Sequence, residues 1–257
     1  MPIPNFPDKS KGKPLLTPQH MLAYRQQAGQ LPQGAGPQAV ILCLQRGLPE
    51  RLKRKHPLRK VGRLNGDLFA LTKTQGRVMV LTNFGLGSPL MAGLAEELIA
   101  WGAQRLISIS MAGGIQADLK AGDLVVCDRA LRDEGTSYHY LPPGDYVAAN
   151  PELVKDLAAS LSAQGQTAHI GATWTTDATF RETDLEVVHY QAAGIKTVEM
   201  ESAALFAVAQ VRRAQAASVF VVGDSLAGGV WRPPGDHRLL DRSFELAYNA
   251  AIEVLKS

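Results

Sequence analysis

Residues 78–110 read VMVLTNFGLGSPLMAGLAEELIAWGAQRLISIS and contain a strand, a helix and a second strand in close succession. The apolar runs VMVLT and LISIS are short and β-rich, which is typical of buried strands. Between them, Pro89 stands near the start of a helical pattern and Gly102 just past its end, the usual places of these residues around a helix. Two strands joined by a helix predict a parallel sheet.

The same alternation continues on both sides of this unit. Further apolar, strand-like runs lie at residues 39–44, 124–127 and 217–223, and helical patterns lie at residues 150–165 and 236–256. We therefore expect an α/β fold with one mainly parallel sheet covered by helices on both faces. Residues 37–257 are expected to form this single domain, and residues 1–36, which begin with a Pro- and Lys-rich stretch, an N-terminal arm.

The charge pattern limits the kinds of partner. The chain of 257 residues has a net charge of +3, and residues 46–60 hold seven Lys or Arg against one Glu. Such a balance suits a small anionic ligand as well as a weak nucleic-acid footprint. No aromatic residue interleaves the basic residues as a base-stacking surface would need. We expect a solvated basic helix and loop here, and no nucleic-acid partner.

The cysteines and the hydropathy of the sequence indicate where in the cell the protein is expected. Cys43 and Cys127 each lie in an apolar stretch and match no metal-ligand spacing, so we expect buried thiols, a reduced cytoplasmic protein and no bound metal. No apolar run approaches the length of a membrane helix, and no membrane partner is expected. The first 14 residues lack the apolar core of a secretory signal.

Ligands of such sheets bind beyond the carboxyl ends of strands, so the residues at those ends are candidates. The strand at residues 39–44 is followed by Gly47 and, one turn on, Arg51. A glycine lets the backbone approach an anion and an arginine can clamp it. A plain Gly-Pro turn is the alternative reading of the same residues.

Glycines also follow two other strands. Gly85 and Gly87 precede a helix, where they would cradle a phosphate or simply permit tight packing of the strand on the helix. Gly113 and Gly114 end a strand and have no side chains. Their absence would let a flat ring lie against the backbone, or the two glycines would mark a bulge.

Acidic residues mark two further places. Asp224 directly follows the apolar run at residues 217–223, where it would serve as a helix cap or as a proton donor. Glu199 and Glu201 bracket Met200 just before an apolar helix, in the sequence TVEMESAALFAVAQ of residues 197–210. One carboxylate is enough to cap a helix, and the other could bind the paired hydroxyls of a ribose beside the apolar Met200.

Together these motifs resemble the nucleoside phosphorylase superfamily, which holds uridine phosphorylases, hexameric purine nucleoside phosphorylases and methylthioadenosine nucleosidases. VEMESAALF is the most specific of them, and FGLGSPLMAGLAEEL, MAGGIQADLKAGDLVV and RDEGTSYHYLPP follow the family in matching order. The last of these is most similar to the uridine phosphorylase branch.

The resemblance implies a Rossmann-like α/β fold, assembled as a homodimer or homohexamer, and cleavage of an N-glycosidic bond. Inorganic phosphate would attack the ribose C1′ of a nucleoside through an oxocarbenium-like transition state and release the free base. No metal or organic cofactor is expected, and phosphate is the co-substrate.

The resemblance assigns the family's nucleoside-binding residues to positions of this sequence that match its motifs. Glu201 matches the glutamate that binds the ribose hydroxyls, Met200 the methionine beneath the sugar, and Glu199 the first glutamate of the motif. Phe180 falls within a residue of an aromatic that stacks on the base. Asp224 matches the aspartate that protonates the leaving base in purine-cleaving members.

The phosphate-binding residues and those shared between subunits carry over in the same way. Gly47 and Arg51 match the phosphate-binding glycine and arginine. Arg63 matches, in a looser register, an arginine lent to the neighbour's phosphate. His20 matches, also loosely, a histidine lent to the neighbour's ribose.

Two departures keep the exact reaction open. The phosphorylases usually have a second phosphate arginine and, three residues on, a Ser or Thr, where this chain has Ser108 and Met111. This favours a hydrolytic nucleosidase as the alternative, and a nucleoside-binding protein without turnover is a third reading. Asp224 points to a purine base, whereas the local likeness points to the uridine branch.

Overall fold

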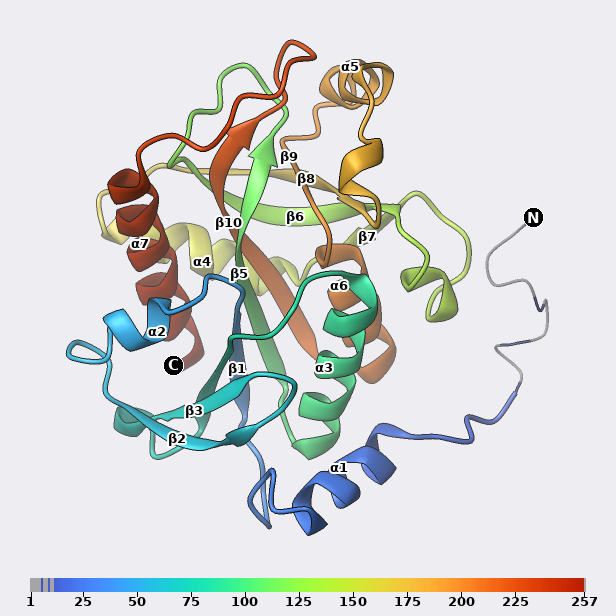
Figure 1. Cartoon of the computed structure of the whole chain (residues 1–257), viewed down its shortest axis with the longest axis vertical. Coiled ribbons are helices and arrows are strands. Elements are labelled where there is room, and N and C mark those ends of the chain that lie inside the picture. Colours follow the sequence, from blue (N-terminus) through green and yellow to red (C-terminus); the bar gives the residue numbers. More distant parts are fainter. Residues whose placement is uncertain (1–5, 7–8, 10–11, 257) are drawn as a thin grey trace.

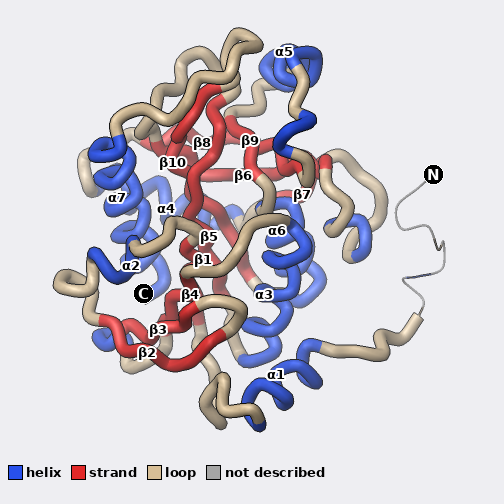
Figure 2. The backbone as a smooth tube through the Cα atoms, viewed as in Figure 1, coloured by secondary structure: helices blue, strands red, loops and turns tan. Residues whose placement is uncertain are grey.

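The computed structural model describes Phe6, Lys9 and residues 12–256 as a sheet wrapped by helices (Figures 1 and 2). The predicted N-terminal arm includes residues 1–5, 7–8 and 10–11, which lie outside the described residues. Its strands are β1 (Ala39–Cys43), β2 (Leu58–Arg63), β3 (Asp67–Leu71), β4 (Val78–Thr82), β5 (Arg105–Gly114), β6 (Leu124–Asp133), β7 (Tyr146–Ala148), β8 (Ala168–Thr176), β9 (Thr197–Glu199) and β10 (Gln215–Ser225).

Helices connect most of these strands. The α-helices are α1 (Pro18–Gln27), α2 (Leu48–Arg51), α3 (Ser88–Trp101), α4 (Pro151–Ala163), α5 (Asp184–Ala192), α6 (Ser202–Arg212) and α7 (His237–Lys256), and 3-10 turns lie at Thr72–Thr74, Ser137–His139 and Thr179–Arg181. Helices α3 and α6 pack on each other, as do α4 and α7, and Figure 1 shows the two pairs on opposite sides of the central strands. The expected α/β class is confirmed.

The strands form one sheet in the order β10-β6-β8-β9-β5-β1-β4-β3-β2, with β7 added to β6. Strand β10 also pairs with β5, so that the sheet closes on itself at one end. The pairings among β1, β4, β5 and β10 are parallel, while β2–β3 and β3–β4 are antiparallel. The result is a mixed sheet with a parallel centre, as expected for strands joined by helices.

The core follows from the apolar runs in the sequence. Every residue of β1 and β4 is buried, and α6 is buried from Ser202 to Ala209 because its small side chains let it approach the sheet and α3 closely. Helix α7 instead has a buried face and a polar face. The five predicted strands are all present, and so are the four predicted helices α3, α4, α6 and α7, although β5 and β6 extend four and six residues beyond their expected carboxyl ends.

Several elements were not expected from the sequence. No residue of strand β2 is buried, and the strand carries Lys and Arg, so it lacks the apolar run by which a buried strand is recognised. Strand β9 is only three residues long. The predicted basic helix and loop at residues 46–60 is a single-turn helix, a loop and the start of β2.

Part of the expected arm is the helix α1, which packs against α3. Thr17 and His20 form a capping box at its start, and Pro18 occupies its first turn. The guanidinium of Arg25 pairs with Glu97 of α3, and both side chains are nearly buried. This part of the arm is therefore attached to the domain, and the division at residue 36 stays a prediction.

Cys43 and Cys127 are buried free thiols, as expected. Burial raises the pKa of the Cys43 thiol to about 12. Among the described residues, no helix combines the length and the apolar character that crossing a membrane requires.

Candidate active site

The candidate residues gather where β5 changes its neighbour. Strand β1 runs beside β5 only as far as the pair Cys43–Ile109, and the chain then turns away toward α2. Beyond that point β9 takes its place, pairing with Gly113 and Gly114. The carboxyl ends of β4, β5 and β10 therefore meet the β9–α6 junction, which is the kind of edge where α/β proteins bind ligands.

Gly113 makes room for the Asp224 carboxylate at this edge. A Cβ atom on Gly113 would lie 3.0 Å from Cγ1 of Val198 and 3.5 Å from Oδ1 of Asp224. Asp224 lies within β10 and is half-buried, and no helix starts there, so the helix-cap reading is wrong. Gly113 and Asp224, near the carboxyl ends of β5 and β10, therefore lie side by side.

The Asp224 carboxylate is held by a loop that folds back over it. The indole Nε1 of Trp231 donates a hydrogen bond to Oδ2 of Asp224 at 2.7 Å. The loop is closed by two backbone hydrogen bonds between Ser225 and Arg232, and its turn contains two glycines with positive φ, at residues 228 and 229. We call residues 225–232 the strap.

Glu199 caps α6. Its Oε2 accepts hydrogen bonds from the backbone N–H groups of Glu201 and Ser202, at 2.9 and 2.8 Å, and its Oε1 accepts one from the Thr175 hydroxyl. Burial, followed by the charge of Glu201, raises the pKa of the Glu199 carboxyl above its usual range. Glu199 therefore satisfies the free N–H groups at the start of the helix.

Glu201 has different partners. Its Oε1 accepts a hydrogen bond from the backbone N–H of Gly87 at 2.7 Å, and its Oε2 one from that of Met200 at 3.2 Å. Its side chain is buried, and this burial raises the pKa of the carboxyl. The two glutamates therefore have different roles. Glu199 caps α6, and Glu201 accepts a hydrogen bond from the glycine turn after β4.

Met200 is half-buried between these elements, and its carbonyl accepts a hydrogen bond from the Ser88 hydroxyl at 2.8 Å. Its Sδ lies 3.3 Å from Oγ1 of Thr179, the residue before Phe180. The Phe180 ring is fully exposed. The turn with the predicted stacking residue therefore lies beside Met200, but the ring itself is not packed against the protein.

Gly47 is the N-cap of the single-turn helix α2 and Arg51 is its last residue, just after the carboxyl end of β1. Gly47 has a φ of +71°, a conformation that favours glycine. Arg51 donates from Nη2 to Oδ1 of Asp241 in α7 at 2.8 Å, and this pair is largely exposed. A Cβ on Gly47 would lie 3.6 Å from Nη1 of Arg51, so the two predicted phosphate-binding residues are neighbours.

Ser108 and Met111 occupy the two positions where the phosphorylases usually have a second phosphate-binding arginine and a Ser or Thr. Ser108 is buried and donates to the Ser218 hydroxyl at 2.6 Å, and Ser218 also bonds to Ser202 at 2.9 Å. The Met111 side chain is 44% exposed and lies over Gly223, where a Cβ would overlap it. An apolar thioether therefore lies beside this end of β5 instead of a hydroxyl.

His20 and Arg63 are exposed on the periphery of the chain. His20 lies on α1, where its ring accepts a bond from the Thr17 backbone N–H, and Arg63 ends the edge strand β2. Within the described part of the chain, neither side chain forms a hydrogen bond or an ion pair with the candidate residues at the strand ends. Their predicted roles concern a neighbouring subunit and stay predictions.

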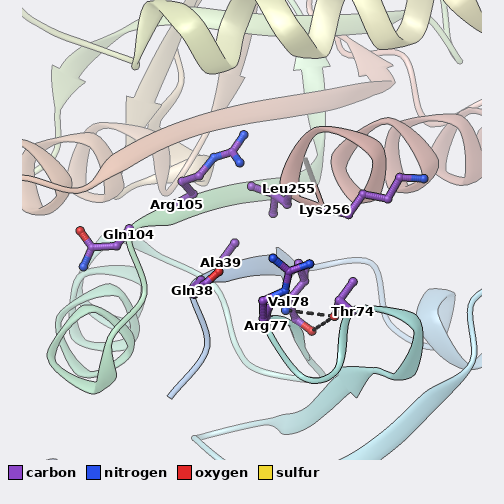
Figure 3. A pocket seen from close by; sticks show the side chains of 9 residues that line it. All are labelled: Gln38, Ala39, Thr74, Arg77, Val78, Gln104, Arg105, Leu255 and Lys256. Atoms are coloured by element: carbon purple, nitrogen blue, oxygen red, sulfur yellow. Dashed lines mark hydrogen bonds between the residues drawn. The ribbon is translucent and has the colours of Figure 1, made fainter. Parts of the chain in front are cut away.

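Two cavities lie at the other end of the sheet. One has a volume of about 270 Å³ and is lined by Ala39, Val78 and Arg105, the first residues of β1, β4 and β5 (Figure 3). An adjoining groove of about 690 Å³ is bordered by Lys73 and Arg77. Because both open at the amino ends of the strands, they are separate from the candidate active site.

Three residues of the site were not singled out from the sequence. Thr175 holds Glu199, Trp231 holds Asp224, and the half-buried Glu182 follows the turn that contains Phe180. Burial, then the charge of Asp224 and that of Glu186, raises the pKa of Glu182 to about 7. Trp231 and Glu182 lie in irregular segments, where periodicity provides no signal.

Comparisons with known proteins identify the family of this chain. A family model described as the phosphorylase superfamily matches residues 40–257. The chain is 28% identical over 154 residues to a guanosine phosphorylase of Halorubrum lacusprofundi, covering 60% of this chain and 64% of that protein. It is 28% identical over 182 residues to a DeoD-type purine nucleoside phosphorylase of Bacillus cereus, covering 70% of this chain and 77% of that protein.

Solved structures show the same fold. A uridine phosphorylase from Vibrio fischeri superposes with a TM-score of 0.73 at 24% identity, over 91% of this chain and 98% of that one. An AMP nucleosidase from Bacteroides thetaiotaomicron superposes with a TM-score of 0.73 at 18% identity, over 93% of this chain and 97% of that one.

Proposed function

The chain belongs to the phosphorylase superfamily, and we propose that it is a nucleoside phosphorylase that cleaves the N-glycosidic bond of a uridine or purine nucleoside. Inorganic phosphate is the co-substrate, and the products are the free base and ribose 1-phosphate. The proposed reaction needs no metal and no organic cofactor.

The buried Glu201 carboxylate is the observation that carries this proposal. Each of its oxygens accepts one backbone hydrogen bond, from Gly87 and from Met200. A carboxylate oxygen has a second acceptor site, so Glu201 can still bind two adjacent hydroxyl groups. The half-buried Met200 offers an apolar surface beside this carboxylate. A carboxylate next to an apolar surface suits a ribose ring, which has two adjacent hydroxyl groups and an apolar face.

The other residues fit around such a sugar. Gly47 and Arg51 supply a backbone turn and a guanidinium for the attacking phosphate. Asp224, against Gly113, is available to donate a proton to a leaving purine. The transition state has positive charge on the ribose ring, which the anionic phosphate and the Glu201 carboxylate would stabilise.

A hydrolytic nucleosidase is the second candidate, and Met111 and Ser108 favour it. The Met111 thioether offers no strong hydrogen bond to a phosphate, and the Ser108 hydroxyl is buried against Ser218. Arg51 is then the one predicted phosphate-clamping cation at these strand ends, and it already pairs with Asp241. With phosphate weakly held, water would be the nucleophile.

An assay with and without phosphate separates the candidates. Inosine, adenosine, uridine and methylthioadenosine are incubated with the protein, and the released base and sugar are separated by chromatography. We expect release that depends on phosphate and yields ribose 1-phosphate. Free ribose without phosphate would identify a nucleosidase, and binding without cleavage over hours would identify a protein that only binds nucleosides.

We further propose a homodimer or homohexamer in which His20 and Arg63 serve the neighbouring subunit's site. Both side chains are exposed in the single chain. Mixing inactive Glu201→Ala subunits with His20→Ala subunits tests this, because sites completed by residues from different chains should regain activity. Mixed assemblies that stay inactive, measured beside their mass by light scattering, would contradict shared sites.

A further inference from the structure

A groove opens at the end of the sheet where β1, β4 and β5 begin, away from the candidate active site. Its volume is about 690 Å³, and it shares Thr74, Arg77 and Lys256 with the cavity of about 270 Å³ beside it. Figure 3 shows Arg77 and Thr74 across that cavity from Lys256. The groove is thus large enough for a small organic molecule such as a nucleotide.

Three segments that are far apart in the sequence line the groove, at residues 55–57, 71–77 and 252–256. Thr72 ties the first two together, because its backbone N–H and its hydroxyl both donate hydrogen bonds to the Pro57 carbonyl at 3.0 Å. The Thr74 hydroxyl closes the turn before β4 by bonding to backbone groups on both sides of it, at 2.8 and 3.1 Å. The turn that carries Lys73 and Arg77 is therefore held in place without a ligand.

The groove has an excess of positive charge. Four of the residues that line it are basic and one is acidic: Lys55, Lys73, Arg77, Lys256 and Glu253. Lys55 pairs with Glu245 at 3.1 Å, and Lys256 pairs with Glu253 at 2.6 Å. The side chains of Lys73 and Arg77 form no hydrogen bond or ion pair with any residue that the structure describes. Two cations without a counter-ion therefore border the groove.

His56, which also lines the groove, is affected by this charge. Its Nε2 lies 2.7 Å from Oδ1 of Asn249. Burial lowers the pKa of His56, and the charges of Lys55 and Lys73 lower it further, against the opposing effects of Asn249 and Glu253. The charges of lysines from two different segments thus act at one place in the groove.

We propose that this groove binds a small phosphorylated compound of nucleotide size, with its phosphate held by Lys73 and Arg77. The planar guanidinium can bind two phosphate oxygens at once, and the ammonium group adds a compact charge. The buried side chains of Leu71 and Ile252 offer an apolar surface against which a base can pack. The site is separate from the candidate active site and does not depend on the function proposed above.

Equilibrium dialysis of the full-length protein against three probes tests this proposal. Pseudouridine 5′-monophosphate is a nucleotide whose base is joined to the sugar by a carbon–carbon bond, so cleavage of an N-glycosidic bond cannot consume it. Ribose 5-phosphate has the phosphate without the base, and pseudouridine has the base without the phosphate. We expect the nucleotide to bind most tightly and ribose 5-phosphate at least about threefold more weakly.

Variants assign the binding to the groove. Lys73→Gln and Arg77→Gln each remove one of the free cations, and we expect each to raise the Kd of the nucleotide about tenfold. Arg77→Lys keeps the charge and should lose less. Lys155→Gln, which removes an exposed cation of α4 outside the groove, is the matched control and should leave the Kd within about twofold of the wild type.

Arg51→Ala separates the groove from the candidate active site, and it too should leave the Kd of the nucleotide unchanged. Because Lys73 and Arg77 are exposed, melting temperatures close to that of the wild type should confirm that their variants are folded.

Three results would overturn the proposal: no binding of either phosphorylated probe to the wild type, equal losses in Lys73→Gln and Lys155→Gln, or a loss confined to Arg51→Ala. Ribose 5-phosphate binding as tightly as the nucleotide would overturn the role of the apolar surface. None of these results changes the proposed function, which the assay with and without phosphate tests separately.

Discussion

Oε1 of Glu201 and the backbone nitrogen of Gly87 lie 2.7 Å apart, although the two residues are 114 positions apart in the sequence. The bond joins the β9–α6 junction to the glycine turn between β4 and α3. Because the accepting carboxylate is buried, this bond fixes the direction of a charged group at the edge of the sheet. The proposed ribose site depends on this direction.

Glu201→Gln should lower kcat/KM with nucleosides by about 100-fold. The amide oxygen can still accept the bond from Gly87, so the fold should be retained, but the charge that strengthens the bonds to the ribose hydroxyls is lost. Steady-state kinetics measure the loss, and a melting temperature close to that of the wild type confirms the fold. An unchanged kcat/KM would remove Glu201 from the ribose site.

Glu199→Ala should act mainly on stability. It would leave the N–H groups of Glu201 and Ser202 and the Thr175 hydroxyl without their acceptor in a buried place. We expect a loss of about 3 kcal/mol in the free energy of unfolding. Urea denaturation measures it, with Glu199→Gln as the control that keeps an acceptor and should lose less. Equal losses in both variants would contradict the capping role.

Arg51→Ala should raise the KM for phosphate at least about tenfold, because it removes a guanidinium that binds anions well. Asp241→Asn should lower that KM, since Asp241 accepts a hydrogen bond from Arg51 and competes with phosphate for it. Both variants should be nearly as stable as the wild type, because the pair is largely exposed. If both substitutions raise the KM, Asp241 does not compete.

The stability of the protein should decrease as the pH rises through the range in which Glu182 ionises. Its pKa is raised to about 7 from an ordinary 4.5, so between these values the folded state binds more protons than the unfolded state. The free energy of unfolding therefore falls with rising pH in this window, and the contribution of Glu182 is fully present only below it. Because Glu182 is half-exposed, the effect is small.

Glu182→Gln tests this linkage, because an amide does not ionise. Urea midpoints at pH 5 and pH 7.5 are compared for the wild type and the variant. We expect the midpoint of the variant to change less between the two pH values. If the wild type and the variant change equally, other groups account for the pH dependence, with the buried Glu199 as the first to examine, since its pKa is raised in the same direction.

Much of the fold could be predicted from short-range patterns. The apolar runs of β1, β4 and β5 and the Pro and Gly residues around α3 are local signals that burial and helix capping require. The exposed edge strand β2 and the short β9 have no such local signal. They exist because a neighbouring strand offers hydrogen-bond partners, which only the assembled sheet supplies.

The residues that can do chemistry at this edge of the sheet were predictable from the sequence: the glycines at strand ends, the two glutamates around Met200, and Asp224. This was possible because ligand sites of α/β sheets lie beyond strand carboxyl ends, and strand ends can be read locally. The partner of each carboxylate, in contrast, follows from the tertiary structure. Glu199 accepts hydrogen bonds from the start of α6, Glu201 accepts one from Gly87, and Asp224 accepts one from Trp231. The sequence does not reveal these pairs, because hydrogen bonds between distant segments depend on how the sheet closes.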